Sequence, residues 1–286
     1  MNVLVTGADG FIGRRLVRRL LSMGHQVSEH AIQDGDIAQE NALDSFQAID
    51  HVFHLAARAF VPDSWTMTHA YYHTNVLGTV TALEYCRKRR ASITFMSTYV
   101  YNEPKYLPID EKHSVSAASP YHETKILCED LCAHYAKGFG VRCAVLRPFN
   151  VYGKGQSGAF LLPTIASQIF DPDIERISVQ DLSPKRDYVY VEDVISAIAA
   201  TVNPRSPYDV FNVGAGSSMS VSEVIDLMLE TAGIRKPYVQ TGAVREGEIS
   251  DCVADVRKLE SAFGLAPMRP LREGLRAWFV EEGWIE

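Results

Sequence analysis

The sequence predicts an α/β protein: a Rossmann-like, doubly wound parallel sheet followed by a smaller α/β C-terminal lobe. Two observations predict the sheet. Short apolar runs alternate with amphipathic stretches up to about residue 150, and a glycine-rich turn joins the first run to the first amphipathic stretch. Such alternation builds a parallel sheet through right-handed crossovers. The pattern loosens after Gly153. We therefore expect one domain over residues 1–152, with returning segments near 187–213, and a second lobe over residues 153–286.

The elements of the first domain follow in order. Val3-Leu4-Val5 is typical of a buried parallel strand. Phe11–Met23 carries apolar residues at helical spacing with arginines between them, and Gly24 is placed to end this helix. The later expected strands are 26–30, 50–57, 92–97 and 141–146, and the later expected helices are 71–89 and 120–138.

In the second half, turn signals separate shorter elements. Strands are expected at 187–191 and 210–213, and a helix is expected over Val221–Ala232. Ser220 precedes this helix and Glu223 follows three residues later, which is the spacing of a capping box. The sequence contains no repeat or flexible linker, so the second lobe should pack closely on the first.

Composition narrows the class of protein. The chain has 286 residues, of which 47% are hydrophobic and 22% charged, as in ordinary globular proteins. The net charge of -7 argues against nucleic acid or an anionic membrane as a partner. No apolar run reaches the roughly 18 residues of a membrane span. Five cysteines without a CxxC spacing indicate a reduced, cytoplasmic protein, and Met1 leads directly into a strand, which leaves no room for a signal peptide.

The glycine-rich turn is the first functional motif. Gly7, Gly10 and Gly13 lie in Thr6–Gly13, which follows a strand and opens a helix. Such glycines allow a tight turn, close approach of a pyrophosphate and close helix–strand packing, while the helix N-terminus favours phosphate. The motif predicts a dinucleotide site. A turn used only for packing is the weaker alternative.

The region after this helix favours NAD over NADP. Glu29, Asp34 and Asp36 lie about 20 residues after the glycines, and no Lys or Arg occurs between Arg19 and Arg58. A 2′-phosphate would call for a cation there. Arg14 and Arg15 could reach it from the first helix, so NADP stays open as an alternative.

A second motif predicts proton-transfer chemistry. Tyr121 and Lys125 lie four apart on one expected helix, so they share a face. The ammonium can lower the phenol's pKa toward neutrality and make it a general acid or base. The hydroxyl-bearing strand end Ser97-Thr98 precedes them. Together with the glycine turn, these residues suggest hydride chemistry on a carbinol. No metal site is expected.

With these motifs on the page, the chain resembles the extended short-chain dehydrogenase/reductases of the NAD-dependent nucleotide-sugar epimerase/dehydratase family. The resemblance covers nearly the whole length. It rests on motifs in a consistent order and spacing: Thr6–Gly13, 54–57 (HLAA), 75–79 (NVLGT), 97–101, 121–125, 146–153 (LRPFNVYG), 186–189, 211–214 and 245–248 (REGE).

The resemblance implies a role for each matching residue. Ser97 stands three before Val100 and takes the place of the catalytic Ser/Thr; Tyr121 would be the acid/base and Lys125 its partner. The implied cofactor contacts are Gly7, Gly10, Phe11, Ile12, Gly13, Asp36, Ile37, Leu55, Ala56, Ala57, Asn75, Tyr121, Lys125 and Pro148. The implied substrate contacts are Ser97, Asn150, Phe160, Leu161, Arg186, Arg245 and Cys252.

Departures from the family pattern refine the expectation. Family dehydratases carry an Asp-Glu pair after the catalytic hydroxyl residue, where this chain has Thr98 and Tyr99, so 4,6-dehydration is disfavoured. Cys252 falls where a tyrosine in some 4-epimerases restricts the pocket to plain hexoses. A small residue there predicts tolerance of 2-acetamido sugars.

The leading expectation is an NAD-dependent nucleotide-sugar 4-epimerase that oxidises C4 transiently and returns the hydride. The alternative is an NAD(P)H-dependent reductase of 4-keto-6-deoxy nucleotide sugars, whose site residues would look nearly identical. A third possibility is a dinucleotide-binding regulator without turnover, against which the Ser97, Tyr121 and Lys125 set argues. By analogy with the family, the expected helices 71–89 and 120–138 pair across a two-fold axis in a homodimer.

Overall fold

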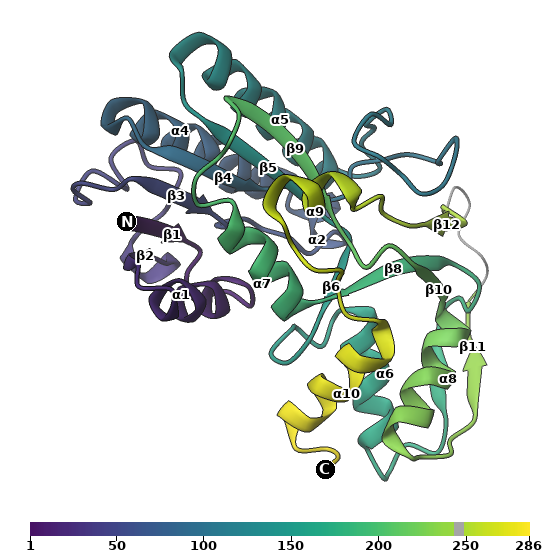
Figure 1. The fold of residues 1–286 in the computed structure, drawn as a ribbon. Coiled ribbons are helices and arrows are strands. Elements are labelled where there is room, and N and C mark those ends of the chain that lie inside the picture. Colours follow the sequence, from purple (N-terminus) through teal and green to yellow (C-terminus); the bar gives the residue numbers. More distant parts are fainter. Residues whose placement is uncertain (243–248) are drawn as a thin grey trace.

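A six-stranded parallel sheet organises the first part of the chain (Figure 1). The computed structural model describes residues 1–242 and 249–286. The strand order is β2-β1-β3-β4-β5-β9. The strands are β1 (Asn2–Thr6), β2 (Gln26–His30), β3 (His51–His54), β4 (Ser92–Met96), β5 (Cys143–Pro148) and β9 (Tyr208–Val213). The predicted doubly wound parallel sheet is confirmed.

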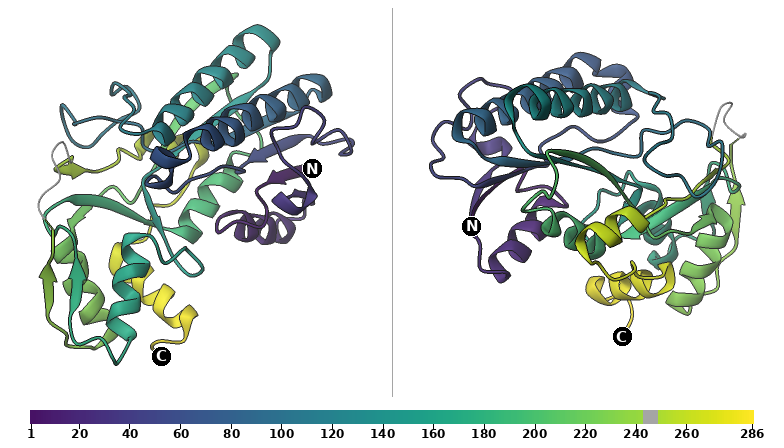
Figure 2. Two further views of the ribbon diagram at one scale, coloured as in Figure 1. Left: turned by 180° about the vertical axis from the view of Figure 1, so that it is seen from behind. Right: turned by 45° about the horizontal axis from the view of Figure 1, so that its top comes forward.

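Helices cover both faces of this sheet (Figure 2). Helices α1 (Gly13–Ser22) and α7 (Val191–Ala200) lie on one face, and α4 (Gly78–Arg89) and α5 (Pro120–Phe139) on the other. Because side chains alternate along a strand, Val3 and Val5 pack with the first pair of helices and Leu4 packs with the second. A strand buried on both faces must be apolar throughout, which explains the unbroken apolar runs in the sequence.

The predicted helix over 71–89 is not one regular helix. The structure has α3 (Thr68–Tyr71), a π-helical segment η2 (Tyr72–Leu77) and then α4. The short α2 (Asp63–Thr66) precedes α3, and the 3₁₀ turn η1 (Ile32–Asp34) follows β2. A π-helical segment changes the phase of the side chains, and such segments are frequent at functional sites. Here it contains Asn75, which is buried beside α5.

The second lobe is built around β8 (Lys185–Tyr190), which pairs with β6 (Asn150–Tyr152), β10 (Ser218–Ser220) and β12 (Asp251–Cys252). A separate pair joins β7 (Ile177–Val179) to β11 (Tyr238–Gln240). The remaining helices are α6 (Leu161–Phe170), α8 (Val221–Ala232), α9 (Arg257–Phe263) and α10 (Leu271–Glu282). After β8 the chain returns through α7 and β9 to the large sheet.

Local signals for the C-terminal elements agree with the structure. The capping box at α8 is confirmed: Glu223 N donates to Ser220 Oγ at 3.2 Å, and Ser220 N donates to Glu223 Oε2 at 2.7 Å.

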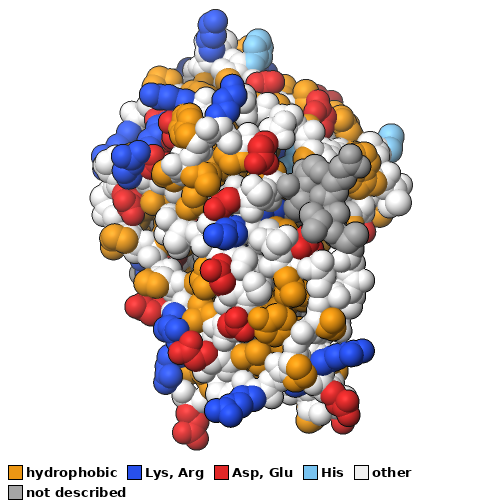
Figure 3. Space-filling model, turned by 90° about the vertical axis from the view of Figure 1, so that its right-hand side faces the viewer, with side chains coloured by type: hydrophobic (Ala, Val, Ile, Leu, Met, Phe, Trp, Pro, Cys, Tyr) orange, Lys and Arg blue, Asp and Glu red, His pale blue; other side chains and the backbone are white. Residues whose placement is uncertain are grey.

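Lys, Arg and acidic side chains are interspersed on the face shown in Figure 3, with hydrophobic side chains in small groups. Over residues 1–242 and 249–286, no helix is both long and apolar enough to span a membrane.

Candidate active site

The glycine-rich turn between β1 and α1 is a tightly packed backbone platform. Gly7 has φ +67°, and a Cβ there would lie 2.8 Å from the backbone nitrogen of Ala56. A Cβ at Gly13 would lie 2.1 Å from the carbonyl oxygen of Gly7. Only glycine fits either position. Ile12 is the N-cap of α1 and has no polar side-chain atom, so the first N–H groups of this helix keep no partner from the cap residue. This arrangement fits the pyrophosphate of a dinucleotide.

The segment after β3 forms the neighbouring wall. Leu55, Ala56 and Ala57 are half-buried there, and Ala56 N donates to Thr6 Oγ1 at 3.3 Å. Thr6 Oγ1 also lies 2.8 Å from Nδ1 of the buried His54. The sequence HLAA thus ties the end of β3 to the start of the glycine turn.

Asp36 and Ile37, two of the implied cofactor contacts, follow β2 and the turn η1. Ile37 is buried, and its Cγ2 lies 2.9 Å from the position that a Cβ of Gly78 would take. Asp36 is half-buried; its Oδ1 accepts from Ala38 N at 2.9 Å, and its Oδ2 lies 3.6 Å from His73 Nδ1. Pro148 is buried at the end of β5.

Asn75, an implied cofactor contact, makes three hydrogen bonds within the protein. Its Oδ1 accepts from Arg58 N at 2.8 Å. Its Nδ2 donates to Arg58 O at 3.1 Å and to Thr124 Oγ1 at 2.9 Å. Both amide hydrogens are engaged in these bonds, and the residue is 1% exposed. Asn75 therefore fastens the loop after HLAA to helix α5, between Tyr121 and Lys125.

Helix α5 presents the tyrosine and lysine to the end of β4. Both residues are buried, with Tyr121 at 7% and Lys125 at 4% exposure. Lys125 Nζ donates to Met96 O at 2.7 Å and lies 5.9 Å from the centre of the Tyr121 ring. The helix begins cleanly because Ser119 caps it and Pro120 occupies its first position.

The expected effect of Lys125 on Tyr121 is not seen in this structure. Burial raises the pKa of Tyr121 well above its usual range, and a hydrogen bond with Thr98 only partly offsets this. Burial also lowers the pKa of Lys125 to about 8. The prediction of a lowered tyrosine pKa was wrong for the protein alone, because the ammonium is turned toward the Met96 carbonyl and a bare phenolate would be poorly solvated.

The first hydroxyl residue after β4 is bonded to a buried ion pair. Ser97 Oγ donates to Glu129 Oε1 at 2.5 Å, and Ser97 is 2% exposed. Glu129 also accepts from Arg147, whose Nη2 lies 2.5 Å and whose Nε lies 3.0 Å from its two carboxylate oxygens. Thr98, the next residue, is also buried, at 8% exposure. Sequence reasoning missed this buried ion pair, although Glu129 lies four residues after Lys125 and Arg147 interrupts an apolar strand.

The predicted substrate contacts lie along β6, β8 and α6. Asn150 is half-buried; its Nδ2 donates to Asp187 O at 3.1 Å, and its Oδ1 accepts from Tyr99 Oη at 3.5 Å. Arg186 Nη1 donates to the carbonyl oxygens of Lys185 at 2.8 Å and Ile249 at 2.7 Å. These contacts hold Asn150 and the Arg186 side chain at one edge of the second lobe.

The two lobes touch through aromatic rings. Phe160, at the start of α6, lies edge-on to Phe60 with their ring centres 5.6 Å apart. Tyr71 Oη donates to Phe60 O at 2.5 Å, and the ring of Tyr71 lies edge-on to that of Tyr121 at 6.4 Å. Leu161 next to Phe160 is 37% exposed. The chain between β3 and α2 therefore links Tyr121 to the second lobe.

Two further expected substrate contacts have a different outcome. Cys252 has no exposed surface and packs in a small cluster with Tyr101, Ile109, Phe149 and Ala254. It does not face an open pocket in this structure, so its expected gating role has no geometric support here. Arg245, with the rest of the 245–248 motif, lies outside the described residues.

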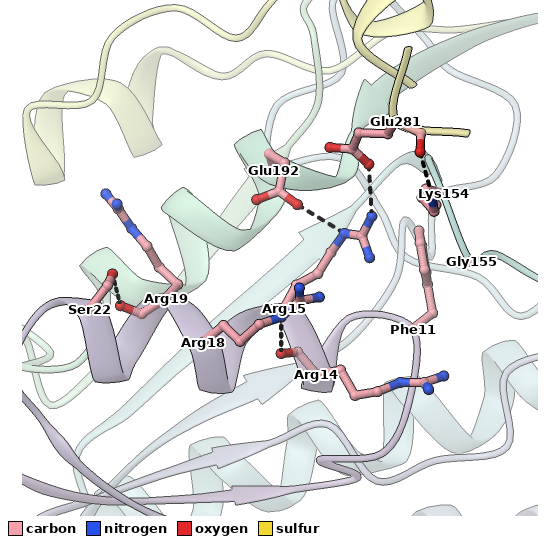
Figure 4. A pocket seen from close by; sticks show the side chains of 10 residues that line it. All are labelled: Phe11, Arg14, Arg15, Arg18, Arg19, Ser22, Lys154, Gly155, Glu192 and Glu281. Atoms are coloured by element: carbon pink, nitrogen blue, oxygen red, sulfur yellow. Dashed lines mark hydrogen bonds and ion pairs between the residues drawn. The ribbon is translucent and has the colours of Figure 1, made fainter. Parts of the chain in front are cut away.

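A separate charged pocket of about 660 Å³ lies beside α1 (Figure 4). Arg15 is directed into it, with Nε 2.9 Å from Glu192 Oε1 and Nη2 3.3 Å from Glu281 Oε2. Arg15 is thus engaged with carboxylates rather than held ready for a 2′-phosphate. The pocket is lined by Phe11, Arg14, Arg15, Arg18, Arg19, Ser22, Lys154, Gly155, Glu192 and Glu281.

Among the described residues, no group of three or more His, Cys, Asp or Glu could hold a metal ion.

Comparison with known proteins identifies relatives over the whole length. The family described as "NAD dependent epimerase/dehydratase family" matches residues 3–214. A putative UDP-glucose 4-epimerase of Methanocaldococcus jannaschii is 32% identical, covering 96% of each chain. A GDP-6-deoxy-D-mannose reductase of Pseudomonas aeruginosa is 28% identical, covering 96% of this chain and 95% of the relative.

Solved structures of similar proteins superimpose on the whole of this chain. RMD from Pseudomonas aeruginosa, complexed with NADPH, superimposes with a TM-score of 0.90 at 27% identity, covering 99% of this chain and 98% of the other. A UDP-glucose 4-epimerase of Thermotoga maritima, with UDP-glucose, gives a TM-score of 0.89 at 28% identity and 99% coverage of both chains. Both similarities extend over the two lobes.

Proposed function

This chain belongs to the NAD-dependent epimerase/dehydratase family and is an enzyme of the extended short-chain dehydrogenase/reductase type, and from that premise we propose that it is a nucleotide-sugar 4-epimerase. The observation that carries the proposal is the buried pair of Tyr121 and Lys125, one turn apart on helix α5 and packed against the end of β4. This is an acid/base group for a carbinol. The 32% identical relative is named as a putative epimerase, which supports this reaction over others.

The residues at the glycine turn fit NAD. Gly7 and Gly13 leave space that no side chain could share, and the open N-terminus of α1 suits a pyrophosphate. When bound, the oxidised dinucleotide supplies the hydride acceptor and a positive charge that favours the Tyr121 phenolate. NAD is preferred because no Lys or Arg lies between Arg19 and Arg58, and Arg15 is held by two glutamates. The structural neighbour with NADPH keeps NADP as the alternative.

The protein's own part in the reaction is proton transfer and positioning. Tyr121 Oη takes the proton from the C4 hydroxyl while the C4 hydride leaves, which gives a 4-keto sugar. It gives the proton back when hydride returns to the opposite face of C4. The buried Lys125 holds positive charge next to this exchange, because a pKa of about 8 keeps it mostly protonated at neutral pH.

The second lobe would hold the nucleotide diphosphate. Asn150 offers an amide at its edge, and Arg186 and Arg245 would supply the guanidinium groups that suit phosphate. Phe160 and Leu161 would pack on the nucleoside. The small residue Cys252 leads us to propose further that 2-acetamido sugars are accepted, which turnover of UDP-N-acetylglucosamine tests.

A reductase of 4-keto-6-deoxy nucleotide sugars is the second candidate. It is favoured by the 28% identical relative named as a GDP-6-deoxy-D-mannose reductase and by the structural neighbour with NADPH. The same tyrosine would then donate a proton to a C4 ketone while an exchangeable NAD(P)H supplies hydride.

Proton NMR separates the two candidates. The purified protein is incubated with UDP-N-acetylglucosamine or UDP-glucose without added cofactor, and appearance of the C4 epimer supports the epimerase. Consumption of NAD(P)H with a 4-keto-6-deoxy nucleotide sugar, with neither UDP-sugar changed, supports the reductase instead. In either case Tyr121→Phe should lose most of the turnover, since it removes the acid/base hydroxyl.

We also propose that the protein is a cytoplasmic homodimer that pairs through α4 and α5. The proposal rests on analogy with the family. Light scattering coupled to size-exclusion chromatography tests it: a mass of one chain would contradict the dimer.

A further inference from the structure

His54, at the end of β3, has a hydrogen-bond partner on each ring nitrogen. Its Nδ1 lies 2.8 Å from Thr6 Oγ1, and its Nε2 lies 3.2 Å from Thr79 Oγ1. Thr6 ends β1 directly before Gly7, and Thr79 lies in the first turn of α4. His54, Thr6 and Thr79 are 1%, 0% and 1% exposed. The ring therefore joins the start of the glycine turn to the first turn of α4 in the interior of the protein.

The ring is neutral and carries its single hydrogen on Nε2. Burial lowers the pKa of His54 to about 3, so one ring nitrogen is a donor and the other an acceptor. The hydroxyl of Thr79 has one hydrogen, which it donates to Asn75 O at 2.7 Å. Thr79 Oγ1 can then only accept from His54, so Nε2 is the donor. Nδ1 is left as the acceptor of the hydrogen of the Thr6 hydroxyl.

These bonds form one chain in which every hydroxyl hydrogen has an acceptor. The chain runs from Ala56 N through Thr6 Oγ1 and the His54 ring to Thr79 Oγ1 and Asn75 O. All its donors point in the same direction along the chain. Hydrogen bonds connected in this way strengthen one another in a buried environment of low dielectric.

Both ends of the chain lie at residues that line the expected cofactor site. The position of a Cβ on Gly7 is 2.8 Å from Ala56 N, so this end is packed against the glycine turn. At the other end, Asn75 Nδ2 donates to Thr124 Oγ1 at 2.9 Å, one residue before Lys125 on α5. The His54 ring therefore connects the glycine turn with the helix that carries Lys125.

A second histidine of β3 makes similar bonds away from this site. His51 has no exposed surface, and its ring nitrogens lie 2.8 Å from Ser92 Oγ and 2.9 Å from Thr94 Oγ1. Both partners belong to the neighbouring strand β4. His51 begins β3, whereas ligands of such sheets bind where the strands end. His51 thus joins two strands only, which makes it a reference for His54.

We propose that His54 is a positioning residue for the dinucleotide: as the neutral Nε2–H tautomer, it holds the glycine turn and the Asn75 segment in the arrangement that binds NAD. Because the ring is buried, it acts through Thr6 and Thr79 and not by contact with the nucleotide. The assignment concerns cofactor binding, and only its consequence for turnover rests on the proposed function.

Isosteric variants of two threonines test the proposal by calorimetry of NAD binding to nucleotide-free protein. Thr79→Val removes the acceptor of His54 Nε2–H, so NAD should bind roughly fivefold more weakly, as expected for the loss of a hydrogen bond. Thr79→Ser keeps the hydroxyl and should restore the affinity. Thr94→Val is the matched control, because it removes the corresponding bond to His51 together with one to Thr201 Oγ1. It should lower the melting temperature and leave the NAD affinity unchanged. Wild-type affinity in Thr79→Val, or an equal loss in Thr94→Val, would overturn the proposal.

NMR of ¹⁵N-labelled histidine gives a readout that needs neither NAD nor substrate. A neutral ring has distinct resonances for its protonated and its bare nitrogen, and those of His54 are assigned by through-space contacts to Thr6 and Thr79. Nε2 should be protonated and Nδ1 bare in the wild type, and the Nε2 resonance should shift in Thr79→Val. A protonated Nδ1 would refute the assignment even if nucleotide sugars are turned over. Failure of the wild type on every nucleotide sugar, with NAD bound normally, would instead count against the proposed function.

Discussion

Removing one partner of the buried Glu129–Arg147 ion pair should destabilise the protein strongly. In Glu129→Gln the guanidinium of Arg147 stays buried at 6% exposure but faces a neutral amide, after losing charge-assisted bonds of 2.5, 3.0 and 3.2 Å. Breaking a buried pair in this way costs about 3–5 kcal/mol. That is a large part of the 5–15 kcal/mol that holds a typical domain folded.

The assay is equilibrium unfolding in urea together with the melting temperature. At about 2–4 °C per kcal/mol for a large domain, the midpoint should fall by roughly 10 °C. Glu230→Gln is the matched control. Glu230 pairs with Arg272 at 2.8 Å, but the two side chains are 63% and 57% exposed, so no measurable change is expected.

A double variant tests the cause. Glu129→Leu combined with Arg147→Met removes both charges, so it should recover part of the stability lost in Glu129→Gln. A Glu129→Gln midpoint within 2 °C of the wild type, at the rate of about 2–4 °C per kcal/mol, would refute the reasoning that this carboxylate neutralises a buried cation.

Three further outcomes are expected. Gly7→Ala should weaken NAD binding at least about tenfold by calorimetry, because the new Cβ at φ +67° would lie 2.8 Å from Ala56 N. An unchanged affinity would argue against this packing. Gly24→Ala is the control that should bind NAD normally, since Gly24 also has a positive φ, +82°, but nothing lies within 4 Å of its Cβ position. Cys252→Tyr should lower the melting temperature, because a larger side chain overpacks a fully buried site at a cost of about 1–3 kcal/mol. A change of sugar selectivity at unchanged stability would instead support a role of Cys252 in restricting the sugar pocket. Burial lowers the pKa of His51 to about 3, below the 6.5 of an unfolded histidine, so its contribution to stability is present above pH 6.5 and lost as the pH falls toward 3. In His51→Gln the free energy of unfolding in urea should therefore depend less on pH between 6.5 and 3. An equal pH dependence in both proteins would contradict the burial argument.

Patterns of short range predicted much of this molecule. The apolar runs and helical spacings located the sheet, and strand β2 and helix α8 occur at the expected residues. These features depend on neighbours within a few positions, which a sequence displays directly. The glycine turn could be predicted equally well from the sequence, because its glycines are required by the backbone geometry of the turn.

The sequence predicted the chemistry of the site only in part. Tyr121 and Lys125 share a helix, so their spacing placed them together. Their charge state was not predicted correctly, since it depends on burial and on Met96, 29 residues away from Lys125 along the chain. The hydrogen bonds of Asn75 and the packing of Cys252 likewise involve residues far away along the chain.

The sequence by itself determined the fold class, the dinucleotide turn and the tyrosine–lysine pair. Only the tertiary structure decided the partner of the Ser97 hydroxyl. Ser97 is claimed by Glu129, 32 residues away, and Glu129 by Arg147, 18 residues further on. A buried polar group must find a partner, and the partner is chosen by how distant segments pack.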